Sequence, residues 1–300
     1  MTKQSLLQAA LTRGMAPEGD LYEELSELGE YEIDSRSEAE ALAKAMTEFV
    51  QRPLDSDEAV SAFPELTRLF QSVTSAEAFR YLAVHGIPLL IEAYDARLID
   101  PGECENDLLF ALKIFARYGT EDGLERIVNA AFSMALQDGF LWSVIFEQLS
   151  DTDPAIRDLV KRLSQPLPDG FVSVALLDWV NRLCRDEIIS GHPFNTVAGI
   201  EKLRGWLVSV NEDEFTYAHA SAAALPFISD PPRSELIALA IDHPDIGVQM
   251  EAAWATAYLG SDSGVKFLAR LCLDPNLAMT ARTYLKELKR MDAIPDEAND

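Results

Sequence analysis

The chain has few basic residues and no long hydrophobic run. Its 300 residues carry 25 Lys and Arg against 50 Asp and Glu, which gives a formal net charge of −25. A surface of that sign repels phosphate backbones and anionic membranes, so neither nucleic acid nor a membrane is expected as the main partner. No window approaches the roughly 20 apolar residues that a transmembrane helix needs, and the N-terminus does not resemble a signal peptide. The acidic excess favours solubility first, and it would also attract a basic protein.

Cysteine and histidine are scarce as well. The cysteines Cys104, Cys184 and Cys272 are odd in number and widely spaced, which argues against a disulfide framework or a zinc site. We expect them to be small buried side chains of a reducing compartment, and we therefore predict a cytoplasmic protein. The sequence also lacks the Gly-x-Ser-x-Gly motif, a phosphate-binding loop and a dinucleotide fingerprint. No catalytic residue, metal or cofactor is predicted.

Strand-like alternation is almost absent, whereas helical periodicity recurs throughout the chain. Within residues 105–118, Leu108, Leu112 and Phe115 fall on one face, and residues 121–137 show the same spacing. Hydrophobic residues make up 48% of the sequence, enough for a continuous core, so a globally disordered chain is excluded. The pattern predicts an all-α fold.

Proline and glycine mark the expected helix boundaries. An Asp before Pro can serve as N-cap while the proline takes the first helical position, and this pair occurs at 100–101, 153–154, 230–231 and 274–275. Gly86, Gly119 and Gly260 each follow an apolar segment, where a left-handed residue after the helix is expected. The predicted helix pairs are 37–51 with 56–72, 75–85 with 88–98, 105–118 with 121–137, 140–150 with 154–165, 171–189 with 196–210, 214–228 with 232–241, and 245–259 with 262–273, followed by a last helix at 276–291.

One segment is internally repeated and resembles a known family. Residues 242–273 contain Asp245 before a helix, Val248 and Ala252-Ala253 inside it, and Leu259-Gly260 at its end. This pattern resembles the HEAT-like repeats, and more narrowly the short bacterial form named after the phycobilisome lyases. The match is good over residues 212–290 and weak before residue 75. The resemblance implies a right-handed α-solenoid of about seven stacked antiparallel helix pairs.

The resemblance divides the chain into three predicted parts. Residues 37–291 are the expected solenoid. Residues 1–36 are an acidic N-terminal segment, for which a short cap helix around Leu21, Leu25 and Leu28 is favoured over a partner-binding acidic segment. Residues 292–300 are expected to be a disordered acidic tail.

Two polar segments are candidate sites. His192 and Asn195 lie in a connector inside a long helix pair, where a solenoid often carries function, although a plain connector is the favoured interpretation. His243 precedes an expected helix start, which favours capping over metal binding. His219 lies on an alanine-rich helix and is expected to be a satisfied, packed histidine, not a base.

The bases of the C-terminal half are unevenly distributed over the predicted helices. In HEAT-like stacks the second helix of each pair usually lines the concave face. Eight of the 14 bases in residues 151–300 fall on predicted second helices, at Arg157, Lys161, Arg162, Lys202, Arg204, Arg233, Lys266 and Arg270. This predicts a concave groove less negative than the convex side, with a basic stripe as its strongest form, although solvated charges that cover the core are the favoured interpretation.

The leading hypothesis is a non-enzymatic module that binds a protein or peptide along its concave face, because an α-solenoid exposes a long curved groove. The partner would be a basic protein at the N-terminal half or an acidic peptide along the stripe. The first alternative is an enzyme or enzyme subunit like the phycobilin lyases, with His192, His219 and Asp242 as contributors. The second is a nucleic-acid binder, against which the charge argues.

Overall fold

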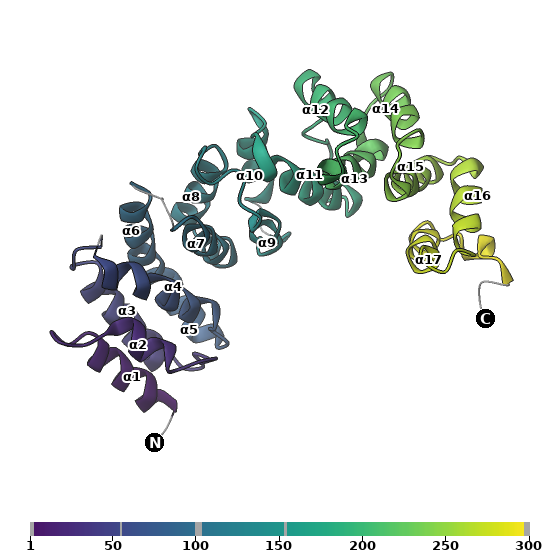
Figure 1. The fold of residues 1–300 in the computed structure, drawn as a ribbon. Coiled ribbons are helices and arrows are strands. Elements are labelled where there is room, and N and C mark those ends of the chain that lie inside the picture. The colour runs from purple at the N-terminus through teal and green to yellow at the C-terminus, as the bar shows by residue number, and fades with distance from the viewer. Residues whose placement is uncertain (1–2, 55, 100–103, 153–154, 297–300) are drawn as a thin grey trace. The chain divides into compact units, whose positions relative to one another are not determined.

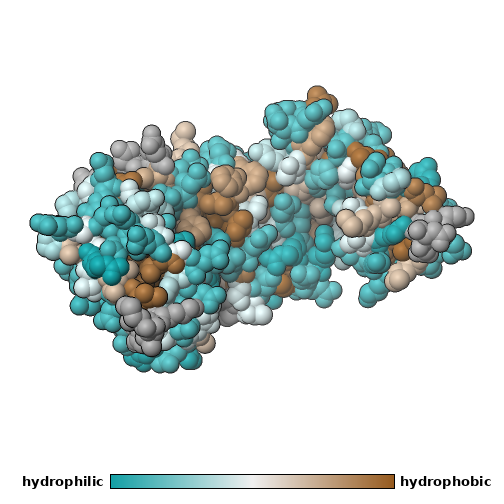
Figure 2. Space-filling model, turned by 60° about the horizontal axis from the view of Figure 1, so that its bottom comes forward, coloured by the Kyte–Doolittle hydropathy of each residue, from teal (hydrophilic) through white to brown (hydrophobic). Residues whose placement is uncertain are grey.

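The structure is a computed structural model that describes residues 3–54, 56–99, 104–152 and 155–296. Within these ranges it is all-helical, with seventeen α-helices, short 3₁₀ turns and one isolated bridge between Ile33 and Val73 (Figure 1). No helix in the described part is long and apolar enough to cross a membrane. One face of the molecule is mainly hydrophilic, with apolar areas interspersed (Figure 2).

The helices form two compact units, Met1–Leu159 with Pro168–Val172, and Val160–Leu167 with Ser173–Asp300. The first contains α1 (Lys3–Gly14), α2 (Leu21–Ser26), α3 (Arg36–Phe49), α4 (Asp57–Gln71), α5 (Ala76–His85), α6 (Ile87–Arg97), α7 (Glu105–Tyr118), α8 (Glu121–Ala131) and α9 (Trp142–Glu147). Helix α10 (Ile156–Ser164) is shared between the units. The second contains most of α11 (Gly170–Arg185), then α12 (Val197–Val208), α13 (Phe215–Ala224), α14 (Pro232–Ile241), α15 (Ile246–Tyr258), α16 (Asp262–Leu271) and α17 (Ala278–Glu287).

Side-chain caps explain where eight of these helices begin. The oxygen of a Ser, Thr or Asp at the N-cap accepts a hydrogen bond from a backbone N–H in the first turn, which satisfies one of the otherwise unpaired donors. Such caps occur at Asp20, Ser35, Ser56, Ser75, Thr120, Thr196, Asp245 and Ser261. The capping role predicted for the segment around His243 is therefore confirmed at Asp245.

The helix boundaries predicted from glycine and proline are confirmed only in part. Gly119 and Gly260 have φ of 62° and 92°, as expected for left-handed residues that end helices. Gly86 has φ of −103° and leads directly into α6, so the prediction there is wrong. The Asp-Pro pairs at 100–101 and 153–154 lie outside the described residues. Neither Asp230 nor Asp274 is the N-cap of the helix that follows. Pro231 takes the N-cap position before α14, and Leu277 takes it before α17.

In the first unit two of the predicted pairs are found, α5 with α6 and α7 with α8, whereas α3 and α4 pack mainly on other helices. Helix α3 packs on α1 and α5, whereas α4 packs on α2 and α7, and α7 packs in turn on α8 and α9. The N-terminal segment belongs to this stack, since α2 buries Leu21 and Leu25 completely between its neighbours. The predicted cap helix is thus present, and α1 precedes it. Of the predicted acidic tail, residues 297–300 lie outside the described residues, and residues 291–293 form a 3₁₀ turn.

The second unit has two layers. The first helices of the predicted pairs, α11, α13 and α15, form one layer with the last helix α17, and α12, α14 and α16 form the other (Figure 1). We call the first of these the first-helix layer. The first-helix layer curves inward, because the Arg185 guanidinium of α11 comes within 3.9 Å of the Glu287 carboxylate of α17 although α13 and α15 lie between these helices. On the other layer α12 packs on α14, while α14 and α16 both pack on α15 and scarcely touch each other.

Gly264 is expected to be essential for the packing of α16 on α15. A Cβ at this position would lie 2.1 Å from the Ala253 carbonyl oxygen, a backbone atom that cannot move without shifting α15. Gly264→Ala should lower the free energy of unfolding by about 1–3 kcal/mol in a denaturant titration. Gly205→Ala is the matched control, because Gly205 lies within α12 with open space around it, and the alanine should be neutral or stabilising there. Equal effects of the two substitutions would contradict this packing.

Candidate functional site

The curved first-helix layer of the second unit gathers polar and aromatic side chains from three helices. Asp178 and Arg185 lie two turns apart on α11, and Glu251, Trp254 and Tyr258 lie at matching intervals on α15. Helix α17 contributes Tyr284 and Glu287. We call these seven residues the concave cluster. Side chains three, four or seven positions apart share one face of a helix, so each helix presents its members together.

Glu251 lies at the centre of the concave cluster. It is half-buried, and its carboxylate accepts a hydrogen bond from the Tyr284 hydroxyl, which joins α15 to α17. Burial raises the pKa of Glu251, and the hydrogen bond from Tyr284 and the nearby charge of His219 offset only part of that rise. The same burial, with Glu251 beside it, raises the pKa of Tyr284. The pair therefore holds a carboxylate in surroundings that disfavour its charge.

Asp178 faces Glu251 and lacks a compensating cation. Its side chain is exposed, and it forms no hydrogen bond or ion pair within the described residues. The protein around it raises the pKa of Asp178 to about 7, and the negative charge of Glu251 adds to that effect. An accessible carboxylate on a curved surface, repelled by a second carboxylate, would be stabilised by an incoming positive charge.

A guanidinium is already bound in the same cluster. Arg185 lies over the Trp254 ring at 4.7 Å from its centroid and pairs with Glu287 at 3.9 Å. Trp254 is only 2% exposed, and Tyr258 stacks on it at 5.3 Å and is 49% exposed. Cation–π contact and a carboxylate together are a common way to hold an arginine or lysine. The cluster thus contains three carboxylates and three aromatic rings but one internal cation, which is paired with Glu287.

His219 has a structural partner beside this cluster. Its Nε2 lies 2.8 Å from the Asp245 carboxylate, which also caps α15 by accepting from the Val248 N–H at 3.0 Å. Gly247 leaves room for the imidazole, since a Cβ there would lie 2.1 Å from the His219 ring. His219 therefore fixes the start of α15, although its ring is half-exposed and not the fully packed histidine that the sequence predicts.

The loop candidates His192 and Asn195 hold the fold together. His192 is 6% exposed, its Nε2 lies 2.9 Å from the Asn181 side-chain oxygen, and Asn181 donates to the Ala220 carbonyl on α13. Burial lowers the pKa of His192 to about 3, so the ring stays neutral. Asn195 is exposed, and its amide donates to the Ser229 hydroxyl at 2.7 Å. These contacts match the favoured interpretation of a plain connector.

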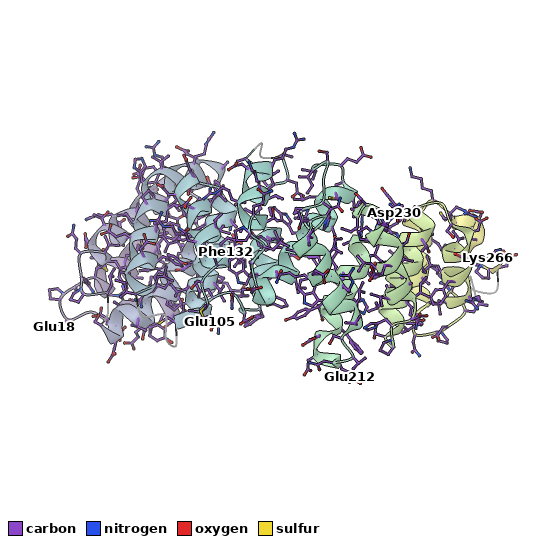
Figure 3. All side chains as sticks on the ribbon, turned by 90° about the horizontal axis from the view of Figure 1, so that it is seen from above. Glu18, Glu105, Phe132, Glu212, Asp230 and Lys266 are labelled. Atoms are coloured by element: carbon purple, nitrogen blue, oxygen red, sulfur yellow. The ribbon has the colours of Figure 1, made fainter. Side chains whose placement is uncertain are left out.

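The bases of the predicted stripe do not lie on the curved layer of the second unit. Lys202, Arg204, Arg233, Lys266 and Arg270 belong to α12, α14 and α16, the opposite layer, while Arg157 and Lys161 lie on the shared helix α10. Figure 3 labels Lys266 on α16. Arg204 pairs with Glu201 and with Glu235, and Arg233 pairs with Asp230, so part of this charge is neutralised locally. A basic surface on this layer stays a prediction.

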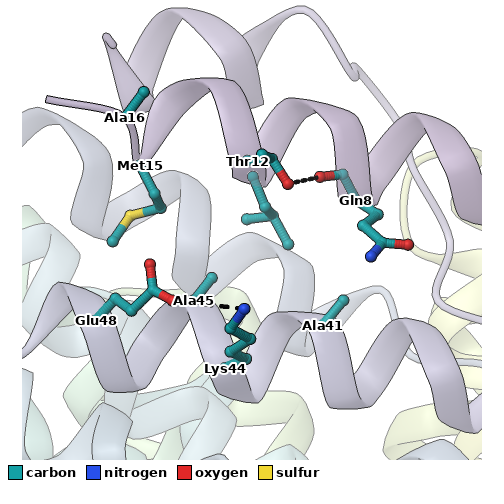
Figure 4. Close-up of a pocket in the computed structure, with 9 residues that line it drawn as sticks. Gln8, Thr12, Met15, Ala16, Ala41, Lys44, Ala45 and Glu48 are labelled. Carbon is teal, nitrogen blue, oxygen red and sulfur yellow. Dashed lines mark hydrogen bonds and ion pairs between the residues drawn. The ribbon is translucent and has the colours of Figure 1, made fainter. Parts of the chain in front are cut away.

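The first unit contains a small cavity whose polar lining is paired in part. A cavity of about 180 Å³ lies between α1 and α3 in the first unit (Figure 4). At its edge Lys44 pairs with Glu48 at 3.8 Å, and the Thr12 hydroxyl donates to the Gln8 carbonyl. Among the described residues no group of three or more His, Cys, Asp and Glu side chains could hold a metal ion, and the three cysteines are unpaired.

The concave cluster left a weak signal in the sequence. Asp178 is the one carboxylate in α11, and Glu251 is the one charged side chain in α15, both within mainly apolar helices. An isolated charge on a predicted buried stripe is unusual, because burying it costs free energy. Their proximity to Tyr284 and Arg185 depends on the curvature of the layer, which the sequence pattern does not give.

The raised pKa of Asp178 predicts an unusual titration. A carboxyl whose pKa is higher in the folded chain than in the unfolded chain contributes stability below about pH 4 that is lost as the pH rises towards 7. Asp178→Asn should therefore raise the unfolding temperature at pH 8 and have little effect near pH 4.5. Carbon-13 NMR of the aspartate carboxyls checks this directly, since one Asp178-dependent resonance should titrate near pH 7. A midpoint near 4 would contradict the proposed environment.

His192 predicts the opposite pH dependence. The pKa of His192 is lower in the folded chain than the roughly 6.5 of an unfolded histidine. The free energy of unfolding therefore decreases as the pH falls below that value, by about 1 kcal/mol per pH unit. His192→Gln should be less stable than the wild type at pH 7.5 and should lose less stability between pH 7 and 5. His85→Gln, at an exposed position on α5, is the control and should follow the wild type. Parallel curves for all three chains would rule out this role of His192.

Comparison with known proteins leaves the chain without an assigned relative. No family model matches it, and no curated protein or solved structure matches it either. The case for a function therefore rests on the side chains described above.

Proposed function

We propose that this chain is a HEAT-like α-solenoid that serves as a non-enzymatic protein-interaction module, and that its concave cluster binds a basic segment of a partner protein. The stacked helix pairs of the second unit and the HEAT-like pattern of residues 242–273 support the solenoid assignment. The observation that carries the binding proposal is Asp178, an exposed carboxylate without a cation, opposite the half-buried Glu251.

The chemistry of the cluster favours a lysine or arginine side chain as the group that is bound. A cation placed between Asp178 and Glu251 would remove the repulsion that raises the pKa of Asp178. The exposed Tyr258 ring, two turns from Glu251 along α15, can pack on an apolar part of the same segment. Arg185 on Trp254 shows that this surface accommodates a guanidinium. The net charge of −25 would also speed the approach of a basic partner.

The enzyme alternative has less support from the geometry. Of its three contributors, His192 is buried against Asn181, His219 is engaged with Asp245, and Asp242 is exposed at the end of α14. Each thus has a separate structural environment, and none lies beside a Ser or Cys nucleophile in the hydrogen bonds that these groups form. The acidic charge remains the argument against nucleic acid as the partner.

A display selection from random 12-residue peptides against the whole protein tests the proposal. We expect enriched sequences to carry Lys or Arg next to an apolar residue. A synthetic peptide with an enriched sequence should bind the Asp178→Asn variant at least fivefold more weakly than the wild type at physiological salt, as measured by fluorescence anisotropy. Arg185→Ala should bind it more tightly, because this substitution frees the Trp254 face and Glu287.

The control removes the same charge elsewhere in the second unit. Asp213→Asn changes an exposed carboxylate in the turn before α13 and should leave the affinity within twofold of the wild type. Enrichment of peptides without basic residues, or equal loss of binding in Asp178→Asn and Asp213→Asn, would refute the concave cluster as the binding site.

A further inference from the structure

A groove runs between α14 and α16 on the layer opposite the concave cluster. Its floor is Ala253 and Thr256 of α15, and its walls are Ile241 of α14 and Phe267 and Gly264 of α16, among others. The enclosed volume is about 240 Å³, the space of roughly eight water molecules in the liquid. The groove exists because α14 and α16 both rest on α15 without packing on each other (Figure 1).

The groove is apolar in effect, because the polar groups on its lining already have partners. The Thr256 hydroxyl donates to the Ala253 carbonyl, the Gln249 amide donates to the His243 carbonyl, and the Ser263 hydroxyl bonds the Ser261 hydroxyl. Ile241 is 50% exposed at the opposite wall. An exposed isoleucine beside a hollow with small side chains at its base is the arrangement that receives apolar side chains of a partner.

Two cations flank this groove without an acidic partner. Lys266 and Arg270 are one turn apart on α16, both exposed, and neither forms an ion pair within the described residues. Arg270 lines the groove and lies over the Phe267 ring at 5.6 Å. In a chain with two acids for every base, uncompensated neighbouring bases are unusual.

We infer that the α14–α16 groove binds an amphipathic helix of a partner protein, with its apolar ridge between Ile241 and Phe267 and its carboxylates against Lys266 and Arg270. A helix laid in a groove buries residues spaced i, i+3, i+4 and i+7, and flanking charges fix its direction. Lys266 and Arg270 are spaced to meet two acidic residues that are also one turn apart. This surface is distinct from the concave cluster in position and in sign of charge, so the protein has two docking surfaces of opposite preference.

A second display selection uses a library of helix-stabilised peptides against the whole protein. We expect winners with apolar residues at helical spacing and Asp or Glu along one edge. A synthetic peptide with an enriched sequence should bind the double variant Lys266→Glu/Arg270→Glu at least tenfold more weakly than the wild type. The same double variant, used as a new target, should select peptides with Lys or Arg along that edge instead. Lys286→Glu/Lys289→Glu makes the same charge change at exposed positions of the same unit and should leave binding within twofold.

Two further variants separate the outcomes. Ser263→Trp fills the groove without changing a charge, so it should abolish binding of the acidic helix while the basic peptides selected above still bind. Asp178→Asn should do the reverse. The inference is overturned if no helix is enriched, if winners lack acidic residues, or if their binding is insensitive to the Lys266 and Arg270 substitutions. Failure of the concave cluster with retention of the groove would refute only the proposed function.

Discussion

Close packing of small side chains between the helices of the second unit is the constraint on which the other features depend. Helices α13 and α15 bury Ala218, Ala222, Ala252 and Ala255 where they meet, and Gly264 lets α16 approach the backbone of α15. The distance between two helices is set by the side chains at their contact. Where first helices approach closely, their layer curves inward, and Arg185 of α11 can reach Glu287 of α17.

The same curvature has opposite effects on the two layers. On the inner side it collects charged and aromatic side chains from helices that are far apart in sequence, and it surrounds Asp178 and Glu251 with enough protein to raise the pKa of each carboxyl. On the outer side it separates α14 from α16 and leaves an apolar groove between them. Within the described residues, Asp178 on the inner surface is a carboxylate without a cation, and Lys266 and Arg270 on the outer one are cations without a carboxylate. Both are groups whose partners a bound protein would supply.

The histidines show how connectors make this arrangement rigid. His192 links α11 to α13 through Asn181, His219 holds the carboxylate that caps α15, and the buried His243 accepts from the Asp245 N–H at that same start. Each ring supplies a hydrogen bond to a side-chain or backbone group that would otherwise have one partner fewer. Polar residues in these connectors are therefore part of the scaffold that positions the two surfaces.

The sequence by itself determined the helices. Apolar side chains at helical spacing, caps such as Asp245 and left-handed glycines such as Gly119 act within a few residues. The predicted helix ranges therefore agree with the structure to within a few positions, except that α8 ends at Ala131, well before the predicted residue 137. The tertiary structure decided which helices meet and which layer curves, because these depend on the summed contacts of many small residues across long separations. The distribution of Lys and Arg along the sequence predicted a stripe that includes the bases of α16. Only the packing of α14, α15 and α16 shows that these bases lie beside a groove. The concave cluster likewise exists only because α17 returns to α11 across two intervening helices.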